Sequence, residues 1–246
     1  MILGMFGPEP DDPSIAEKLQ HLRSDDPEVR RRAVRALGRL GLRAIQALAE
    51  RLGYEETPWV RRDVAEVLRA VGRAWYEIFL RRLRDGTTEA RERAADALGW
   101  MGQAAAVPEV LPALVLCLET DTYPSVRRAA ADALGWMGQA AAAPEVLRAL
   151  AGRLRDEDRA VRVAAAWALG RMGPAAAAPE VLEALAERLR DEDPAVRRAA
   201  ADALRAMGPA AATLETFRAL AGCLRDRDRD VRRAATEALV RLAPAG

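Results

Sequence analysis

The chain has 246 residues, of which 50% are hydrophobic but only 4% aromatic, and its formal net charge is +1. A balance of 38 basic against 37 acidic residues argues against a general nucleic-acid binder, which usually carries a clear basic excess. No apolar run approaches the roughly 18 residues of a membrane span, and the first seven residues lack the features of a signal peptide. Together with free cysteines, this favours a cytoplasmic, alanine-rich helical protein that does not enter a membrane.

The chain begins with a Gly-, Pro- and Asp-rich segment over residues 1–13, which we interpret as a tail. Apolar side chains within it could fold back as a cap over the first repeat. From residue 14 onward, the apolar pattern has the period of helices, and no strand pattern interrupts it. The helices come in pairs joined by short acidic turns.

Residues 191–208 show the repeating unit most clearly. Asp193 is placed to cap a helix, Pro194 stands at its first position, and Gly208 stands where the helix should end. Between them the apolar residues follow the i, i+3, i+4, i+7 spacing of one helical face. These residues are Val196, Ala199, Ala200, Ala203, Leu204 and Met207.

The first residue of this apolar face recurs along the chain at intervals of 30 to 36 residues. These leading residues are Val29, Val60, Ala90, Val126, Val161, Val196 and Val231. Internal repeats of this length are typical of solenoids. We therefore predict an all-α fold, an α-solenoid of seven helical hairpins forming one array over residues 14–243. The expected repeats are 14–41, 42–72, 73–102, 103–138, 139–173, 174–208 and 209–243.

The pattern Asp-x-x-Val-Arg-x-x-Ala-Ala-x-Ala-Leu-Gly in the second helix of each pair resembles HEAT repeats. The most similar variety is the bacterial one named after phycobilisome lyases, which also occurs in the sensor arrays of STAND-type NTPases. The resemblance covers residues 14–243 and implies a superhelix of hairpins that serves as a scaffold or binding surface. The chain has no Gly-x-x-x-x-Gly-Lys-Ser/Thr sequence, so nothing in it resembles the NTPase itself.

An arginine follows every leading residue: Arg30, Arg61, Arg91, Arg127, Arg162, Arg197 and Arg232. An acidic residue stands in each preceding turn: Asp25, Glu56, Asp85, Asp121, Asp156, Asp191 and Asp226. The resemblance implies that these groups bond within and between repeats as a structural ladder. A row of phosphate-binding arginines is the alternative interpretation.

The resemblance also implies that the second helices line a concave face. Counted from the leading residue, offsets 2, 6 and 10 should point away from the core and into that face. They give a basic N-terminal end and a central strip with three tryptophans, and exposed aromatic residues among charges are typical binding anchors. The predicted partner-binding residues are Arg31, Arg35, Arg39, Asp96, Trp100, Arg128, Asp132, Trp136, Trp167 and Arg171. Alternatively, the indoles pack along neighbouring helices with nothing bound.

The sequence offers little for catalysis. His21 is the only histidine, which excludes a His-rich metal centre and the di-iron hydroxylases of the wider superfamily. The serines have no histidine base nearby, and Cys117 and Cys223 lack the close spacing of a zinc site. These two cysteines are three repeats apart, too far for a disulfide within one chain. We expect no enzyme activity, no cofactor and no metal.

The predicted function is a non-catalytic scaffold that binds a protein or peptide on the concave face. Nucleic-acid binding in the groove is one alternative, since HEAT-like DNA glycosylases use grooves with Trp and Asp. A lyase-like or chromophore-chaperone role is a second, suggested by the family name. A third is assembly, in which the uncapped C-terminal repeat pairs with another copy or belongs to a longer array.

Overall fold

The computed structural model describes residues 79–243, without the side chains of Trp100 and Ala104, and isolated positions before them. The chain divides into two compact units, Met1–Ile78 and Phe79–Gly246. In the first unit the described residues are His21, Ser24, Asp26, Glu28, Val29, Arg32, Tyr76 and Glu77. The tail, the rest of the first repeat, the whole second repeat and five predicted residues (Arg30, Arg31, Arg35, Arg39 and Arg61) lie outside the described residues.

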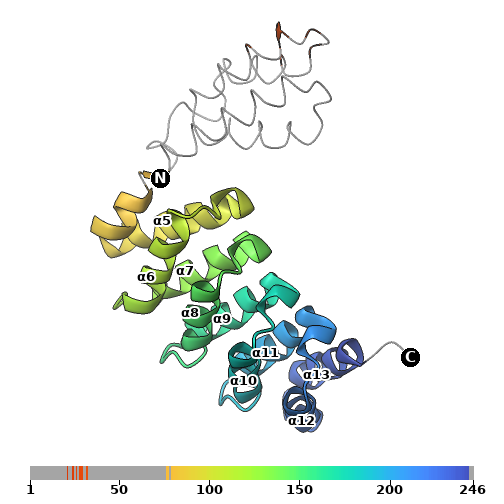
Figure 1. Cartoon of the computed structure of the whole chain (residues 1–246). Coiled ribbons are helices and arrows are strands. Elements are labelled where there is room, and N and C mark those ends of the chain that lie inside the picture. Colours follow the sequence, from red (N-terminus) through yellow and green to blue (C-terminus); the bar gives the residue numbers. More distant parts are fainter. Residues whose placement is uncertain are drawn as a thin grey trace. The chain divides into compact units, whose positions relative to one another are not determined.

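The second unit is an α-solenoid, as predicted, and no strand occurs within residues 79–243 (Figure 1). A helical segment over 79–85 comes first. The α-helices that follow are α5 (Thr88–Trp100), α6 (Val110–Thr120), α7 (Pro124–Met137), α8 (Pro144–Arg153), α9 (Arg159–Met172), α10 (Pro179–Arg188), α11 (Pro194–Met207), α12 (Leu214–Cys223) and α13 (Arg229–Leu242). Short 3-10 helices connect the hairpins: η2 (Gly102–Ala105), η3 (Gly138–Ala141), η4 (Gly173–Ala176) and η5 (Gly208–Ala211).

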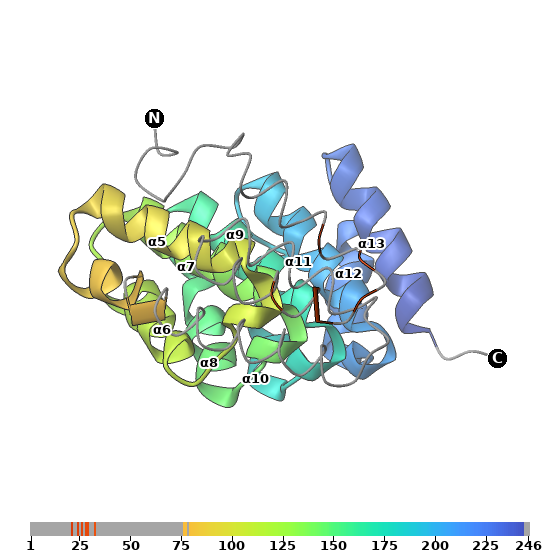
Figure 2. The same ribbon diagram turned by 90° about the horizontal axis from the view of Figure 1, so that it is seen from above.

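The helices form two layers (Figure 2). The second helices of the hairpins, α5, α7, α9, α11 and α13, pack side by side in one layer. The first helices, α6, α8, α10 and α12, form the other layer, and each packs against the second helix of its own hairpin. Each hairpin therefore rests on its neighbours, which is how a solenoid buries a core without closing into a globule.

Local sequence explains where these helices begin and end. The carboxylate of Asp193 accepts a hydrogen bond from the backbone N–H of Ala195 at 2.8 Å, and Asp158 and Asp228 cap α9 and α13 in the same way. At the other end, Gly138, Gly173 and Gly208 have φ angles of 59°, 62° and 61°. Glycine adopts these positive angles without steric cost, so the chain leaves the helix and enters the 3-10 turn there.

Most of the predicted apolar face lies in the core, but Ala90 and Ala199 are only partly buried. The leading residues Val126, Val161, Val196 and Val231 are all fully buried, together with leucines and alanines of the same helices. Cys117 and Cys223 are buried free thiols in the layer of first helices. Among the residues that the structure describes, no helix has the length and apolar character to cross a membrane.

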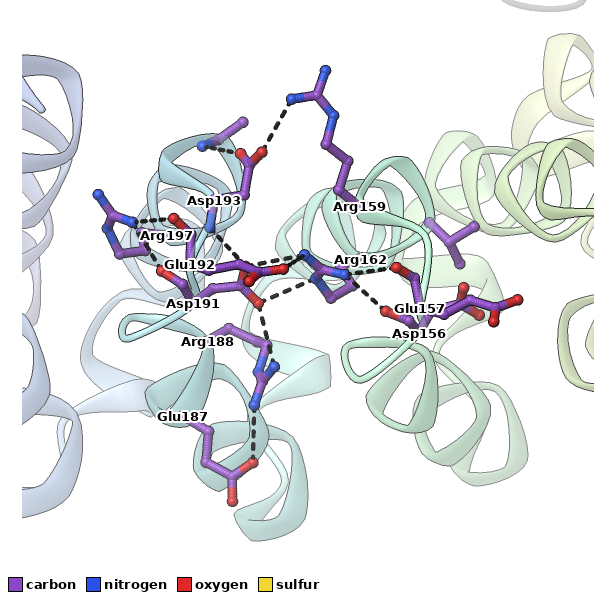
Figure 3. Close-up of polar contacts among 12 residues, drawn as sticks. Asp156, Glu157, Arg159, Arg162, Glu187, Arg188, Asp191, Glu192, Asp193 and Arg197 are labelled. Carbon is purple, nitrogen blue, oxygen red and sulfur yellow. Dashed lines mark hydrogen bonds and ion pairs between the residues drawn. The ribbon is translucent and has the colours of Figure 1, made fainter.

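A ladder of ion pairs joins successive repeats on the loop side of the array. Four of the described arginines that follow a leading residue each reach the aspartate in the turn of the next repeat, as Figure 3 shows for Arg162 and Asp191. The pairs are Arg91–Asp121 at 2.6 Å, Arg127–Asp156 at 2.8 Å, Arg162–Asp191 at 3.1 Å and Arg197–Asp226 at 2.7 Å. Charge-assisted, two-pronged contacts of this kind are both strong and directional, so they fix the rotation of each hairpin on the next.

Each ladder arginine also holds its own turn. Nη1 of Arg127 donates to the backbone carbonyls of Asp121 and Thr122, at 2.9 and 3.1 Å. Its partner Asp156 accepts a hydrogen bond from the backbone N–H of Asp158 at 3.0 Å. One guanidinium thus links two acidic turns. Arg232, the last of the series, donates to two carbonyls of its own turn in the same manner.

The ladder should make the stability of the array fall in acid. The hydrogen bond from Arg197 holds the pKa of Asp226 below its usual range, while burial opposes this shift. At Asp156 burial raises the pKa, but the Arg127 guanidinium outweighs it and the net pKa is lowered. Carboxylates with lowered pKa stabilise the folded state above their unfolded pKa of about 3.9, and this contribution disappears as pH falls through the folded-state pKa.

We therefore expect the urea midpoint, followed by far-UV circular dichroism, to drop as pH is lowered from about 4 towards 2. Asp226→Asn serves as the control, because it should be less stable at pH 7 but lose less on acidification. Equal midpoints at pH 7 and pH 2.5 in the unmodified protein would contradict this role of the ladder.

Candidate binding groove

A groove of about 1120 Å³ runs across α7, α9 and α11 on the face formed by the second helices. Its charged and large side chains are Arg128, Asp132 and Trp136 from α7; Arg159, Val163, Trp167 and Arg171 from α9; and Arg198, Asp202 and Arg205 from α11. Alanines and Gly170 complete the lining. These small side chains form the floor of the groove, so a ligand there can approach the helix backbones, and the larger side chains surround this floor.

Five of the residues predicted from the sequence line this one groove: Arg128, Asp132, Trp136, Trp167 and Arg171. They belong to neighbouring repeats and stand at offsets 2, 6 and 10. Asp96 lies on α5, half-buried and outside the lining. Trp100 is the last residue of α5, and its side chain is not among the described groups.

Trp136, Trp167 and Arg171 form a compact group, here named the Trp–Arg cluster. The two indole rings meet edge to face, with centroids 5.1 Å apart and an interplanar angle of 65°. The guanidinium carbon of Arg171 lies 5.7 Å from the Trp136 ring centroid and 5.8 Å from that of Trp167. This geometry is that of a cation–π contact with each ring. Trp136 is nevertheless 51% exposed, while Trp167 is half-buried.

Gly135 determines where the Trp167 ring can lie. A Cβ atom on Gly135 would stand 2.3 Å from Cζ3 and 2.7 Å from Cε3 of Trp167. The indole therefore occupies the space that any other residue at position 135 would fill. Gly170, at the same offset in the next repeat, makes room for the backbone of Ala203 in the same way, with a Cβ-to-Cα distance of 3.0 Å.

Two carboxyl groups on the α5–α7 side of the groove are less acidic than usual. Burial raises the pKa of Asp132; the nearby Arg128 opposes this shift and the charge of Asp96 adds to it. The pKa of Asp96 is raised by burial and by Glu92, against the effect of Arg128. Within the part of the chain that the structure describes, no three His, Cys, Asp or Glu side chains gather as a metal site would require.

The set predicted from the sequence omitted four charged groove residues: Arg159, Arg198, Asp202 and Arg205. Arg198 and Asp202 stand at offsets 2 and 6, so extending the predicted strip by one repeat would have included them. Arg205 occupies offset 9, where the two preceding repeats carry Gly135 and Gly170. Arg159 stands before the leading residue of α9, and no pattern in the sequence distinguishes it.

Solved structures with a similar fold are repeat proteins of low sequence identity. An engineered protein from the Northeast Structural Genomics Consortium matches with a TM-score of 0.58 and 21% identity, covering 93% of this chain and 96% of its own. A second engineered protein from the same consortium matches with a TM-score of 0.57 and 23% identity, over 94% and 99%. A designed armadillo repeat protein in complex with the peptide (KR)4 has a TM-score of 0.57 and 19% identity, over 93% and 99%.

At these identities the structural matches establish the fold alone. A comparison with curated protein sequences found no significant match. A sequence model of HEAT repeats, by contrast, matches residues 2–69, 76–153, 111–186 and 147–240, which together cover nearly the whole chain. The match is to HEAT repeats in general and does not single out the phycobilisome-lyase variety. With the hairpin array and its repeated second-helix pattern, this places the chain in the HEAT-repeat family.

Proposed function

We propose that the protein is a non-catalytic scaffold that binds an extended segment of a partner protein in the groove across α7, α9 and α11. The observation that carries this proposal is the Trp–Arg cluster, in which Trp136 is 51% exposed in a groove lined mostly by alanine and charged residues. Half-exposed indoles in concave sites are characteristic anchors of protein interfaces, because burying the ring releases ordered water from a large apolar surface.

The fold suits an extended ligand. Side-by-side second helices present side chains at a regular spacing, and solenoids use such continuous concave surfaces for binding. The designed armadillo protein with a similar fold holds a peptide, (KR)4. That example supports a peptide in a groove of this type but not its sequence.

The test uses a displayed library of random 12-residue peptides, selected on the protein and then measured individually by fluorescence polarisation. Trp136→Ala is expected to weaken the selected peptides about tenfold, since truncating an anchor residue costs more than 1 kcal/mol. Tyr123→Ala is the matched control: Tyr123 is an equally exposed aromatic residue, at 53%, but lies in the turn before α7 and not in the groove.

Tyr123→Ala should leave the affinity within about twofold of the unmodified protein. If both alanine variants bind the peptides equally well, or if the library yields no peptide that depends on Trp136, the groove is not the binding surface and the proposal fails.

A further inference from the structure

The charges of the groove indicate which kind of segment it takes. Five arginines line it against two aspartates, Asp132 and Asp202. The arginines are Arg128, Arg159, Arg171, Arg198 and Arg205. Although the chain as a whole is nearly neutral, this excess of positive charge is concentrated on one concave surface, where low-dielectric walls strengthen its field.

Arg171 differs from the other four arginines. Among the described residues, it is the groove arginine for which no carboxylate lies within ion-pair distance; its observed contacts are the two indole rings. Stacking holds the guanidinium plane but leaves its N–H donors unused. A cation fixed in this way, on an apolar platform in a groove, is arranged to receive a carboxylate from outside the chain.

Arg159 donates a hydrogen bond to Asp193 at 3.0 Å, but the other three groove arginines have long or exposed ion pairs. Arg128 lies 3.7 Å from Glu92, and Arg198 lies 3.7 Å from Asp202, both beyond hydrogen-bond distance. The Arg205–Asp202 contact is 3.3 Å, and its side chains are 44% and 37% exposed. Exposed pairs of this quality contribute little to stability, so these arginines can turn to a ligand at small cost.

We propose that the segment bound in the groove is acidic, with one carboxylate seated on Arg171 and a neighbouring apolar side chain packed against Trp136. This inference rests on the proposed function and names the chemistry of its ligand. The Ala-rich floor accommodates the apolar side chain, and the arginines of α7 and α11 receive further carboxylates on either side of Arg171.

The spacing of the second helices predicts how far apart the acidic residues of the bound segment should be. Neighbouring packed helices lie roughly 8–10 Å apart, and an extended chain advances about 3.3 Å per residue. Arg171 and Arg205 stand at offsets 10 and 9 of the neighbouring helices α9 and α11. An extended segment that crosses from one to the other would therefore present two acidic residues about three positions apart.

The groove's own carboxylates distinguish this ligand from a nucleic acid. Asp132 and Asp202 line the groove, and Glu92 and Asp96 follow on α5. A continuous phosphate backbone would pass close to these groups, and each would repel it. A peptide avoids this repulsion, because it can place uncharged residues and backbone N–H groups opposite Asp132 and Asp202.

The same random peptide library tests the inference, because selection should change the average charge of the peptides. Sequencing before and after selection should show Asp and Glu enriched and Lys and Arg depleted. For a selected acidic peptide, Arg171→Gln should weaken binding about tenfold, as expected for the loss of a charge-assisted hydrogen bond. A peptide with Asn and Gln in place of its Asp and Glu should bind the unmodified protein and Arg171→Gln equally. Arg148→Gln is the matched control, since Arg148 is exposed on α8, outside the groove.

The two proposals fail in different ways. A selected pool that depends on Trp136 but is basic or has no charge preference overturns the acidic ligand and leaves the peptide-binding function standing. If Arg171→Gln binds the acidic peptides as tightly as the unmodified protein does, the acidic ligand is likewise overturned and the peptide-binding function stands. Loss of the Trp136 dependence overturns both. A 12-nucleotide single strand or duplex that binds more tightly than the selected peptides, and loses affinity in Arg171→Gln, would instead assign the groove to nucleic acid.

Discussion

Replacing Asp156 with alanine is expected to lower the free energy of unfolding by about 3 kcal/mol. The Asp156 side chain is 2% exposed and its partner Arg127 is 7% exposed, so the variant leaves a buried guanidinium whose one remaining carboxylate contact is the exposed Glu157, at 3.2 Å. Removing one member of a buried ion pair is costly for this reason, whereas the intact pair is only modestly stabilising. The variant also removes the acceptor for the N–H of Asp158.

A second pair, between the next two repeats, provides the comparison. Arg155 and Glu187 are also 2.8 Å apart, but their side chains are 61% and 38% exposed. Glu187→Ala should therefore cost about 0.5 kcal/mol or less, because water replaces the lost carboxylate. Urea unfolding of both variants, followed by circular dichroism, measures the difference. Equal losses would show that the ladder does not derive its strength from burial.

Amide hydrogen exchange adds the location of the effect. Because each repeat contacts only its neighbours, loss of the Arg127–Asp156 ion pair should weaken the interface between the two repeats that it joins. We expect faster exchange in α7 and α9 of Asp156→Ala than in α11 and α13. A uniform increase over all described helices would indicate that the array unfolds as one cooperative unit.

The regular features of this fold follow from the repeat itself. A capping aspartate stands at the same offset before α9, α11 and α13, and a glycine with positive φ follows α7, α9 and α11, so these helices begin or end in the same way. The apolar face then has one possible direction, towards the neighbouring hairpins. Local signals and long-range packing agree in the repeats that the structure describes, which is why the helical architecture can be predicted from sequence.

The sequence alone does not show which aspartate each ladder arginine binds. Asp121 stands 6 residues before Arg127, and Asp156 stands 29 residues after it. Both were available as partners. In the structure the arginine takes the carboxylate of the later residue and the backbone carbonyl of the earlier one. Only the stacking of the hairpins brings the later carboxylate within reach.

The Trp–Arg cluster also depends on packing that the sequence does not encode locally. Offsets 6 and 10 identify Trp167, Trp136 and Arg171 as outward-facing residues on neighbouring helices. Their mutual contacts depend on how closely α7 and α9 approach. Gly135, at offset 9, permits that approach, and its role becomes apparent only when the Trp167 ring is seen to occupy the space above it.

Gly135→Ala is accordingly expected to destabilise the array by about 2 kcal/mol, the usual cost of forcing a methyl group into a filled site. The new Cβ would meet the Trp167 ring at 2.3 Å and the Cα of Ala168 at 2.9 Å. The ring can swing away, but the backbone of α9 cannot, so the two helices must separate. Near-UV circular dichroism should change as well, because the edge-to-face contact of Trp136 and Trp167 is lost.

Gly152 on α8 isolates the steric effect from the general preference of helices for alanine. A Cβ at Gly152 would meet nothing within 4 Å, so Gly152→Ala should stabilise the protein by up to about 1 kcal/mol. The same substitution thus has opposite signs at two helical positions, and the difference between them measures the contact at Gly135. If Gly135→Ala also stabilises the protein and leaves the tryptophan signal unchanged, α7 and α9 do not hold the Trp167 ring against Gly135, and the Trp–Arg cluster loses its structural basis.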